Sequence, residues 1–536
     1  MTSANRRMAV LSCAALVATT AAGCASATKV VTGGDSSGAI TMGTTNVTSV
    51  LDPAGAYDAG SWMVLNNTFQ SLLKFPAGAT VPQPDAAQSC EFTGSDAKTY
   101  HCTLRSGLKF SNGHALTAAD VVFSVQRMQK IDDKNGPSSL LSTIASVEAS
   151  GDAEVTFHLN APDAVLPAKL ASAAGSIVDH QVFPADKLLE NSKLVGSGPY
   201  KMDSVEEADA ESHSIGKVSL SANSNYKGDA KLQSDKFALR FFAKADELKT
   251  ALDKGDVDVA DNSLEPSAAA QIKNDELAGK GNLKVAEGDG AETRFLVFNT
   301  KDPIGGNVAV RQAIAQLLDR KALARDVYAS TVQPLYSVVP TGITAHNTAF
   351  FDKYGEADVN KAKKILTNAK ITTPIKITLT WSRARAGADE LNLVKKQLEA
   401  SGLFQITVEQ EPDWNAFKAG WDAGKYQAYT VGWTPDYADP DDFISPLVVD
   451  GGAFHNGWDD PKISQSLVPD SIKSTDRTAG GSYNQIQKLI ADAVPLLPMY
   501  QNKSFFASRN DITGIEGTMD TTGVVRFWEI GRVKKG

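Results

Sequence analysis

The amino-acid sequence predicts an α/β or α+β protein with mixed sheets. Strand-like and helix-like runs alternate along the chain, and no fixed-period repeat interrupts them. The 536 residues are enough for two to four domains at roughly 150 residues each. Hydrophobic residues make up 42% and charged residues 21% of the chain, which is ordinary globular usage and excludes a disordered or fibrous protein.

The first predicted elements surround the start of a helix. The run Leu104–Phe110 has loosely alternating polarity, which indicates a short strand, and it ends at a turn-prone Ser-Asn-Gly. Thr117 offers a side-chain oxygen to cap a helix, and Asp120, three positions later, completes the pattern of a capping box. The apolar residues after this cap keep one helical face: Val121, Val122, Val125 and Met128.

Alternating polarity and the helical spacing of apolar residues also predict the later strands and helices. Apolar runs predict strands at Val155–Leu159, Phe237–Phe242, Gly255–Ala260, Thr293–Asn299, Ile375–Trp381 and Gln427–Gly432. Helical spacing predicts helices at Ala245–Leu252, after a cap at Asn307 (Val310, Ile314, Leu317, Leu318), at Leu391, Val394 and Leu398 up to Gly402, and at Ile486, Leu489, Ile490 and Ala493. Pro495 and Pro498 stop the last helix from continuing.

The N-terminus has the pattern of an export signal. Two arginines precede the apolar run Met8–Ala22, which is too short to cross a bilayer comfortably. The small residues before Cys24 resemble the lipobox of bacterial lipoproteins, although Ala21 stands where Leu is usual. We therefore expect a signal peptide at residues 1–23, and a tether at residues 24–39 that is anchored outside the cytoplasm by a lipid on Cys24. Plain secretion with cleavage nearby is the alternative.

The charge of the chain argues against nucleic acid as a partner. There are 53 basic and 62 acidic residues, which give a formal net charge of −9. Removing residues 1–23 would delete two arginines and no acidic residue, and would make the chain more acidic still. An acidic chain of this size lacks the basic surface that phosphate backbones require.

Two of the four cysteines predict a disulfide bond. Cys13 lies in the predicted signal peptide and Cys24 at the predicted lipid site, which leaves Cys90 and Cys102. These two flank the segment Glu91–His101, whose turn-prone Thr-Gly-Ser-Asp would bring two short strands together. In an oxidising compartment we expect the pair to be bonded, which would add on the order of 3 kcal/mol of stability in the chain-entropy model. Two buried thiols are the alternative.

Catalytic and cofactor motifs are scarce in the sequence. Gly34–Gly38 matches the G-x-S-x-G nucleophile pattern, but it lies in the predicted tether, without the strand and helix that the motif needs. The sequence has no phosphate-binding loop of the G-x-x-x-x-G-K-[ST] type. None of the seven histidines pairs at i,i+3 or i,i+4, so no local metal site is predicted, while a site assembled from distant parts stays open. We expect a protein without enzymatic activity or cofactor.

An acidic run beside two aromatic residues is the best candidate for a binding site. Asp436–Asp442 holds four carboxylates but lacks the ligand pattern of a calcium loop. Trp433 and Tyr437 lie next to Asp436, and a carboxylate shielded by aromatic rings suits a primary ammonium group. This combination indicates binding rather than turnover. A solvated turn is the alternative.

Several stretches share a common order with a known family. They are Leu51–Pro53, Asn67–Leu73, Thr99–Gly113, Leu116–Ser124, Val195–Lys201, Leu252–Asp258, Val310–Ile314, Leu318–Arg320, Trp433–Pro440 and Pro495–Tyr500. Together they resemble the extracytoplasmic solute-binding proteins of the peptide/nickel class, family 5, which feed ABC importers. Cys102 lies inside one of these stretches, and its pairing with Cys90 is not a general feature of that family.

The resemblance implies a two-lobed, type II periplasmic-binding-protein-like α/β fold with an additional α+β domain. The implied boundaries are 40–78, 198–292 and 503–536 for lobe I, 79–197 for the additional domain, and 293–502 for lobe II. Two crossings between the lobes, near Thr293–Asn299 and Tyr500–Phe506, would form the hinge.

The resemblance also implies which residues bind the ligand. Asp436 matches the aspartate that binds the α-ammonium group of a peptide, with Trp433 and Tyr437 beside it; an Asp that caps a turn is the alternative.

Residues on both lobes are expected to complete the cleft. Arg383 and Arg385 of the second lobe are candidates for the peptide carboxylate, with exposed solubilising charge as the alternative. Tyr57 and Asp58 lie in the stretch of the first lobe that lines the cleft.

The resemblance therefore implies a monomeric, lipid-anchored substrate-binding protein. It would capture dipeptides or oligopeptides between its lobes and deliver them to separate permease and ATPase subunits of an ABC importer. Alternative ligands are an oligosaccharide, a nickel chelate, another amine-bearing solute or a signalling peptide. A secreted hydrolase is the alternative outside this class.

Overall fold

The computed structural model describes residues 38–46, 48, 50–208, 214–382, 387–449, 451–478 and 480–533. The predicted signal peptide and Cys24 lie outside the described residues, and so do Arg383 and Arg385. Within the described part of the chain, no helix has the length and the apolar character that crossing a membrane requires.

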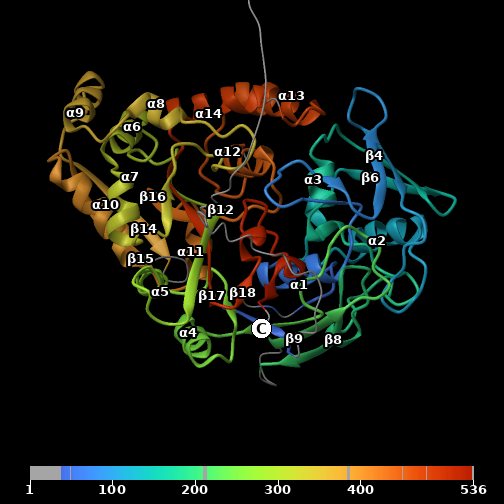
Figure 1. The fold of residues 1–536 in the computed structure, drawn as a ribbon. Coiled ribbons are helices and arrows are strands. Elements are labelled where there is room, and N and C mark those ends of the chain that lie inside the picture. The colour runs from blue at the N-terminus through green and yellow to red at the C-terminus, as the bar shows by residue number, and fades with distance from the viewer. Residues whose placement is uncertain are drawn as a thin grey trace, which may run out of the picture. The chain divides into compact units, whose positions relative to one another are not determined.

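The largest sheet is built from strands along most of the chain's length (Figure 1). Its strands follow in the spatial order β15 (Phe404–Glu411), β14 (Ile375–Ser382), β16 (Ala428–Trp433), β12 (Leu283–Phe298), β17 (Leu496–Arg509), β11 (Val259–Ala260), β1 (Ile40–Thr44), β10 (Lys236–Phe241), β9 (Ile215–Ala222) and β8 (Tyr200–Glu207), with β13 (Val332–Pro334) also paired to β17. β14 is parallel to β15 and β16, and β1 is parallel to β10 and β11, while β12 and β17 are antiparallel. The sheet is therefore mixed, as the sequence predicts.

The two longest strands join the two ends of this sheet. β12 and β17 pair with each other over most of their length and run side by side in Figure 1. The C-terminal part of β12 pairs with β16, whereas the C-terminal part of β17 pairs with β11. The register of the pair shifts between Asp289 and Thr293, so the ladder is interrupted where the chain passes from one half of the sheet to the other.

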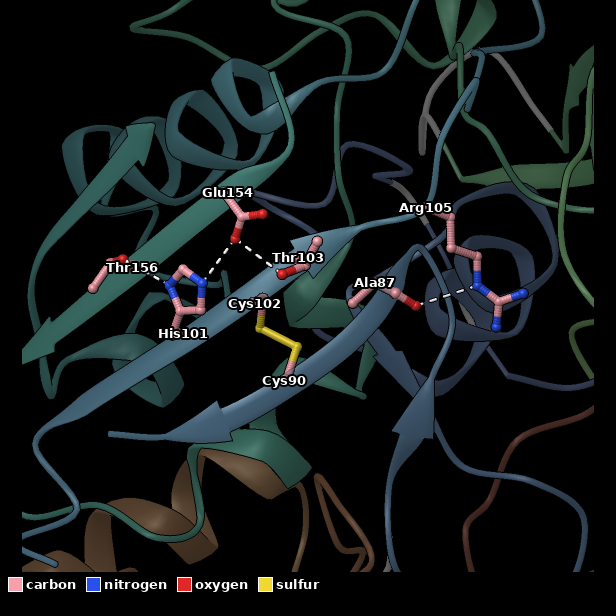
Figure 2. The surroundings of a disulfide bond; sticks show 8 residues. All are labelled: Ala87, Cys90, His101, Cys102, Thr103, Arg105, Glu154 and Thr156. Carbon is pink, nitrogen blue, oxygen red and sulfur yellow. Dashed lines mark hydrogen bonds and ion pairs between the residues drawn. A yellow bond between two sulfur atoms is a disulfide. The ribbon is translucent and has the colours of Figure 1, made fainter. Parts of the chain in front are cut away.

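A separate four-stranded antiparallel sheet carries the cysteine pair. Its order is β4 (Ala87–Phe92), β5 (Thr99–Leu104), β7 (Glu154–Leu159) and β6 (Ile144–Ser150). Cys90 and Cys102 are direct partners across β4 and β5, and their sulfur atoms are bonded (Figure 2). His101 points to the other face of the same strand, where its Nε2 lies 2.7 Å from Glu154. The adjacent residues Cys102 and His101 thus point to opposite faces of the strand, where one forms the disulfide bond and the other an ion pair.

Two further strand pairs are short: β2 (Leu73–Lys74) with β3 (Gln83–Pro84), and β18 (Ile512–Thr513) with β19 (Gly531–Arg532).

Several of the helices begin at a residue whose side chain caps them. They are α1 (Ala59–Thr68), α2 (Ala118–Ile131), α3 (Leu166–Leu170), α4 (Ala245–Lys254), α5 (Pro266–Leu277), α6 (Val308–Leu317), α7 (Arg320–Ala322), α8 (Ala349–Tyr354), α9 (Val359–Asn368), α10 (Ala388–Ala400), α11 (Trp414–Asp422), α12 (Ser445–Val448), α13 (Val468–Lys473) and α14 (Gly481–Ala493). The predicted capping box of Thr117 and Asp120 is present at α2, and Asn307 caps α6. These local predictions are confirmed.

Two strand predictions need correction. The run Leu104–Phe110 is not a strand, because β5 ends at Leu104 and Gly107 then adopts a left-handed φ of +69° in a turn. Its alternating polarity comes from the end of β5 together with an isolated bridge from Lys109 to Ala115. In Gly255–Ala260 only the last two residues pair as β11, because Gly255 is the left-handed C-cap of α4.

A buried ion pair ties the start of the chain to α2. Arg127 donates to both carboxylate oxygens of Asp52, at 2.8 and 2.6 Å, and both side chains are at most 1% exposed. Arg127 also donates to the carbonyls of Pro184 and Lys187. The Leu-Asp-Pro stretch of the sequence is thus held by a bidentate ion pair, and further donors of the Arg127 guanidinium bind backbone carbonyls.

Candidate functional site

The acidic run predicted to bind a ligand follows strand β16. The strand ends at Trp433, and the chain turns through residues 434–438 to Asp439, which caps a short 3-10 helix at Pro440–Phe443. Asp439 accepts from the backbone N–H of Asp441 at 2.8 Å. The loop thus begins and ends on hydrogen-bonded elements, which fixes the direction of its side chains.

Two of the four carboxylates in this loop have a structural role. Arg477 donates to both oxygens of Asp439, at 3.0 and 2.5 Å, and to the hydroxyl of Tyr483 at 2.7 Å. Asp441 accepts from the hydroxyl of Ser445 at 2.6 Å. Both carboxylates are buried, so these contacts satisfy them inside the protein.

Asp436 differs from Asp439 because no described residue gives it a cationic partner. Its Oδ2 accepts from the hydroxyl of Tyr57 at 2.8 Å, and its backbone N–H donates to Asp442 Oδ2 at 2.5 Å. No Lys, Arg or His among the described residues lies within ion-pair distance of Asp436 or Asp442. Asp436 is only partly exposed, and burial raises the pKa of its carboxyl group to about 6. Burial and the neighbouring Asp436 also raise the pKa of Asp442.

Tyr57 reaches Asp436 from the start of α1. Its ring packs against Trp62 with centroids 5.6 Å apart, and the indole of Trp62 donates to the carbonyl of Ala56. Asp58 caps α1: its carboxylate accepts from the backbone and hydroxyl of Ser61 and from the hydroxyl of Thr48. Asp58 therefore orients the segment that presents Tyr57, while its own oxygens are already engaged.

The two aromatic residues beside Asp436 have different surroundings. Trp433 is partly exposed and meets Phe454 edge-on at 6.1 Å, and its buried indole N–H has no hydrogen-bond partner among the described residues. Tyr437 is 6% exposed and belongs to the main hydrophobic core. Of the two aromatic neighbours, Trp433 has an indole N–H that could donate a hydrogen bond to a ligand.

A buried cluster that the sequence did not indicate lies beside the paired strands. Arg294 of β12 donates to Glu390 Oε1 at 3.2 Å, and the hydroxyls of Tyr328 and Tyr500 donate to Glu390 Oε2 at 2.6 and 2.8 Å. Glu390 stands in the first turn of α10, just after the end of β14 and the undescribed residues 383–386. The cluster links β12 and β17 to the element that follows the two predicted arginines. Its members are far apart in sequence, so no motif could have revealed it.

A cavity of about 380 Å³ lies away from Asp436. Phe69, Phe75 and Trp528 form apolar parts of its wall, and Lys74 and Asp85 form polar parts. Neither Tyr57 nor Asp436 lines it. It was not anticipated from the sequence.

Comparison with known proteins identifies the family. The model of the bacterial extracellular solute-binding proteins, family 5, matches residues 81–454. The dipeptide-binding protein DppE of Bacillus subtilis is 23% identical over 499 residues, which cover 88% of each chain.

Solved structures with the same fold cover nearly the whole chain. The substrate-binding protein CtaP of Listeria monocytogenes has a TM-score of 0.77 at 21% identity and covers 93% of this chain and 99% of its own. The DppA protein of Helicobacter pylori in complex with the peptide STSA has a TM-score of 0.73 at 23% identity, with coverages of 93% and 98%. These structures confirm the predicted periplasmic-binding-protein-like α/β fold class. The match over residues 81–454 shows that the chain belongs to the bacterial extracellular solute-binding proteins of family 5.

Proposed function

We propose that this solute-binding protein captures peptides by their amino terminus, with Asp436 as the ion-pair partner of the α-ammonium group. The observation that carries the proposal is the partly buried carboxylate of Asp436, which has a hydroxyl neighbour but no cationic one in the described part of the chain. A buried carboxylate without a counter-charge is costly, and a ligand ammonium would supply that charge.

The surroundings of Asp436 support a cationic rather than an anionic ligand. Asp442 lies directly behind the backbone N–H of Asp436 and adds a second carboxylate to the same loop. The unpaired indole N–H of Trp433 is a donor that suits a peptide carbonyl. An ammonium followed by a carbonyl two bonds along the chain is the chemistry of a peptide N-terminus. A sugar or a nickel chelate offers no such charge to Asp436.

The names of the relatives support the same substrate class. Curated relatives include a dipeptide-binding protein and an oligopeptide-binding protein of Bacillus subtilis, and one structural neighbour was solved with a peptide. We propose Arg383 and Arg385 as candidates for the carboxylate end of the ligand, because they directly follow the last residue of β14 in the sequence. Tyr57 contributes from the first predicted lobe.

We further propose that the peptide is bound and released intact, by a monomeric protein held outside the cell membrane through a lipid on Cys24. Separate permease and ATPase subunits of an ABC importer would receive the peptide. The predicted lobes, 40–78 with 198–292 and 503–536 against 293–502, and the additional domain 79–197 would move about the paired strands β12 and β17. The interrupted register near Asp289 supports a hinge there.

The experiment that tests the function is calorimetry with free and N-acetylated forms of the same short peptides. We expect the free peptides to bind and the acetylated ones to lose at least ~tenfold in affinity, because acetylation removes the charge that pairs with Asp436. Equal affinity for both forms would contradict the role of Asp436.

Mass spectrometry of ligands released from the denatured purified protein tests the substrate class and the absence of turnover. We expect intact peptides. An oligosaccharide or a nickel chelate would overturn the peptide assignment, and peptide fragments that accumulate during incubation would indicate a hydrolase.

A further inference from the structure

Two buried carboxylates and two half-exposed histidines meet at the start of α2, outside the site described above. Asp120 and Asp179 have side chains that are 1% exposed, whereas the side chains of His180 and His114 are 42% and 41% exposed. His180 Nδ1 lies 2.6 Å from Asp120 Oδ1, and His114 Nδ1 lies 2.7 Å from Asp179 Oδ2. One ligand atom from each of Asp120, Asp179 and His180 lies within 4.8 Å of the other two.

One oxygen of each carboxylate faces a histidine ring. Asp120 Oδ2 accepts from the backbone N–H and the hydroxyl of Thr117, and Asp179 Oδ1 accepts from the backbone N–H of Gln181. Asp120 Oδ1 and Asp179 Oδ2 are the oxygens that contact imidazoles. Asp120 Oδ1 also accepts from the backbone N–H of His180 at 3.2 Å, and Asp179 Oδ2 also accepts from the side-chain amide of Asn112. Both oxygens of each carboxylate are therefore held in place by protein donors, and a bound ion would share the oxygens that face the histidines.

In the part of the chain that the structure describes, no permanent cation balances the charge of this cluster. Among the described residues, no lysine or arginine lies within ion-pair distance of Asp120 or Asp179, and the histidines are their ion-pair partners. Arg127, although on the same helix, is fully engaged with Asp52. Two buried carboxylates a few ångströms apart require positive charge between them.

We propose that Asp120, Asp179 and His180 bind a divalent transition-metal ion of the Zn²⁺ type. A mixed set of one imidazole and two carboxylates suits Zn²⁺ and its first-row neighbours, whereas Ca²⁺ and Mg²⁺ prefer oxygen ligands alone. In a tetrahedral Zn²⁺ site, ligand atoms about 2.0–2.2 Å from the metal lie ~3.4 Å apart. The ligand atoms of the cluster lie within 4.8 Å of one another, so its widest pair would draw together by at most ~1.4 Å when the ion binds.

Neighbouring side chains hold the ligands in position. Phe123 meets the ring of His180 edge-on at 6.2 Å, and Asn112 donates to Asp179 Oδ2 at 2.8 Å. His114 contacts Asp179 but is not part of the group of mutually close ligand atoms, so we assign it a positioning role. The bound ion would join the first turn of α2 to the segment that carries Asp179 and His180, and His114 would contact it only through Asp179.

Calorimetry with Zn²⁺ alone tests this site on the full chain, purified without a histidine tag and stripped with a chelator. The variants are H180Q and H114Q, which alter half-exposed rings, and H455Q as a matched control. His455 is also half-exposed, with a side-chain exposure of 45%, but it lies 3.5 Å from a single carboxylate, that of Asp422.

The site predicts a graded pattern of Zn²⁺ affinity. We expect one Zn²⁺ per chain in the wild type, a loss of at least ~100-fold in H180Q, about tenfold in H114Q, and no change in H455Q. Mg²⁺ and Ca²⁺ should not compete. A wild-type Kd weaker than ~1 mM, or unchanged affinity in H180Q, would overturn the proposal.

A second measurement keeps the test decisive if H180Q does not fold. Anomalous diffraction from wild-type crystals grown with Zn²⁺ should place the ion between Asp120, Asp179 and His180. Density for the ion only at other residues would overturn the proposal. Peptide affinity measured on the same samples should be unchanged in H180Q, which separates this site from the proposed peptide site.

Discussion

The hydroxyl of Tyr57 lies 2.8 Å from Oδ2 of Asp436, although 379 residues separate the two in sequence. Tyr57 belongs to the segment before α1 and Asp436 to the loop after β16, so the contact joins the two predicted lobes. The hydrogen bond stabilises the ionised form of Asp436 without neutralising it. A ligand that brings a positive charge to this carboxylate therefore finds it oriented, and no described residue compensates its charge.

Replacing Asp436 by alanine should weaken peptide binding at least ~tenfold, because the ligand ammonium would lose its charged partner. Calorimetry with a short free peptide measures the change. Asp459→Asn serves as the control, since Asp459 is an exposed aspartate in another loop. Affinity in Asp436→Ala that equals the control would remove Asp436 from the binding site.

Peptide affinity should fall as the pH drops below about 6, the value to which burial raises the pKa of Asp436. The ionised carboxylate pairs with the ammonium, and its fraction decreases about tenfold per pH unit below the pKa. Peptide ammonium groups stay protonated throughout this range, so the loss reports on the protein. Affinity that is constant from pH 7 down to pH 4.5 would show that Asp436 does not bind the charge.

Tyr57→Phe should move the midpoint of this pH dependence upward. The hydroxyl of Tyr57 donates to Asp436 and lowers the pKa of its carboxyl group, opposing the larger effect of burial. Removing the hydroxyl leaves the ring packed on Trp62. The midpoint comes from affinities measured across the pH range, with Tyr336→Phe as the control because that ring packs on Phe351. A midpoint that moves downward or stays in place would contradict the assigned hydrogen bond.

Arg127→Met should lower the free energy of unfolding by about 3–5 kcal/mol, because it leaves the buried carboxylate of Asp52 unpaired. Urea unfolding followed by circular dichroism measures the change. Glu356→Gln is the matched control: it breaks an exposed ion pair with Lys321 and should cost less than about 1 kcal/mol. Losses of similar size in both variants would show that burial of the Arg127 pair adds nothing.

Local signals in the sequence predicted local structure well. The capping box of Thr117 and Asp120 lies within one turn, so its hydrogen bonds depend on few distant contacts. The strand at Leu104–Phe110 was mispredicted because alternating polarity continued past the end of β5, and the turn at Gly107 carried no pattern that overrode it.

The sequence by itself determined the class of the fold, the family and the loop that carries Asp436, since these depend on patterns of neighbouring residues. Only the tertiary structure decided which carboxylates are free to act. Arg477 neutralises Asp439, and Asp58 caps α1. Among the described residues, Asp436 has the hydroxyl of Tyr57 as its partner and no cation. The charge balance of a side chain depends on partners that can lie hundreds of residues away. The residues next to it in the sequence do not reveal those partners.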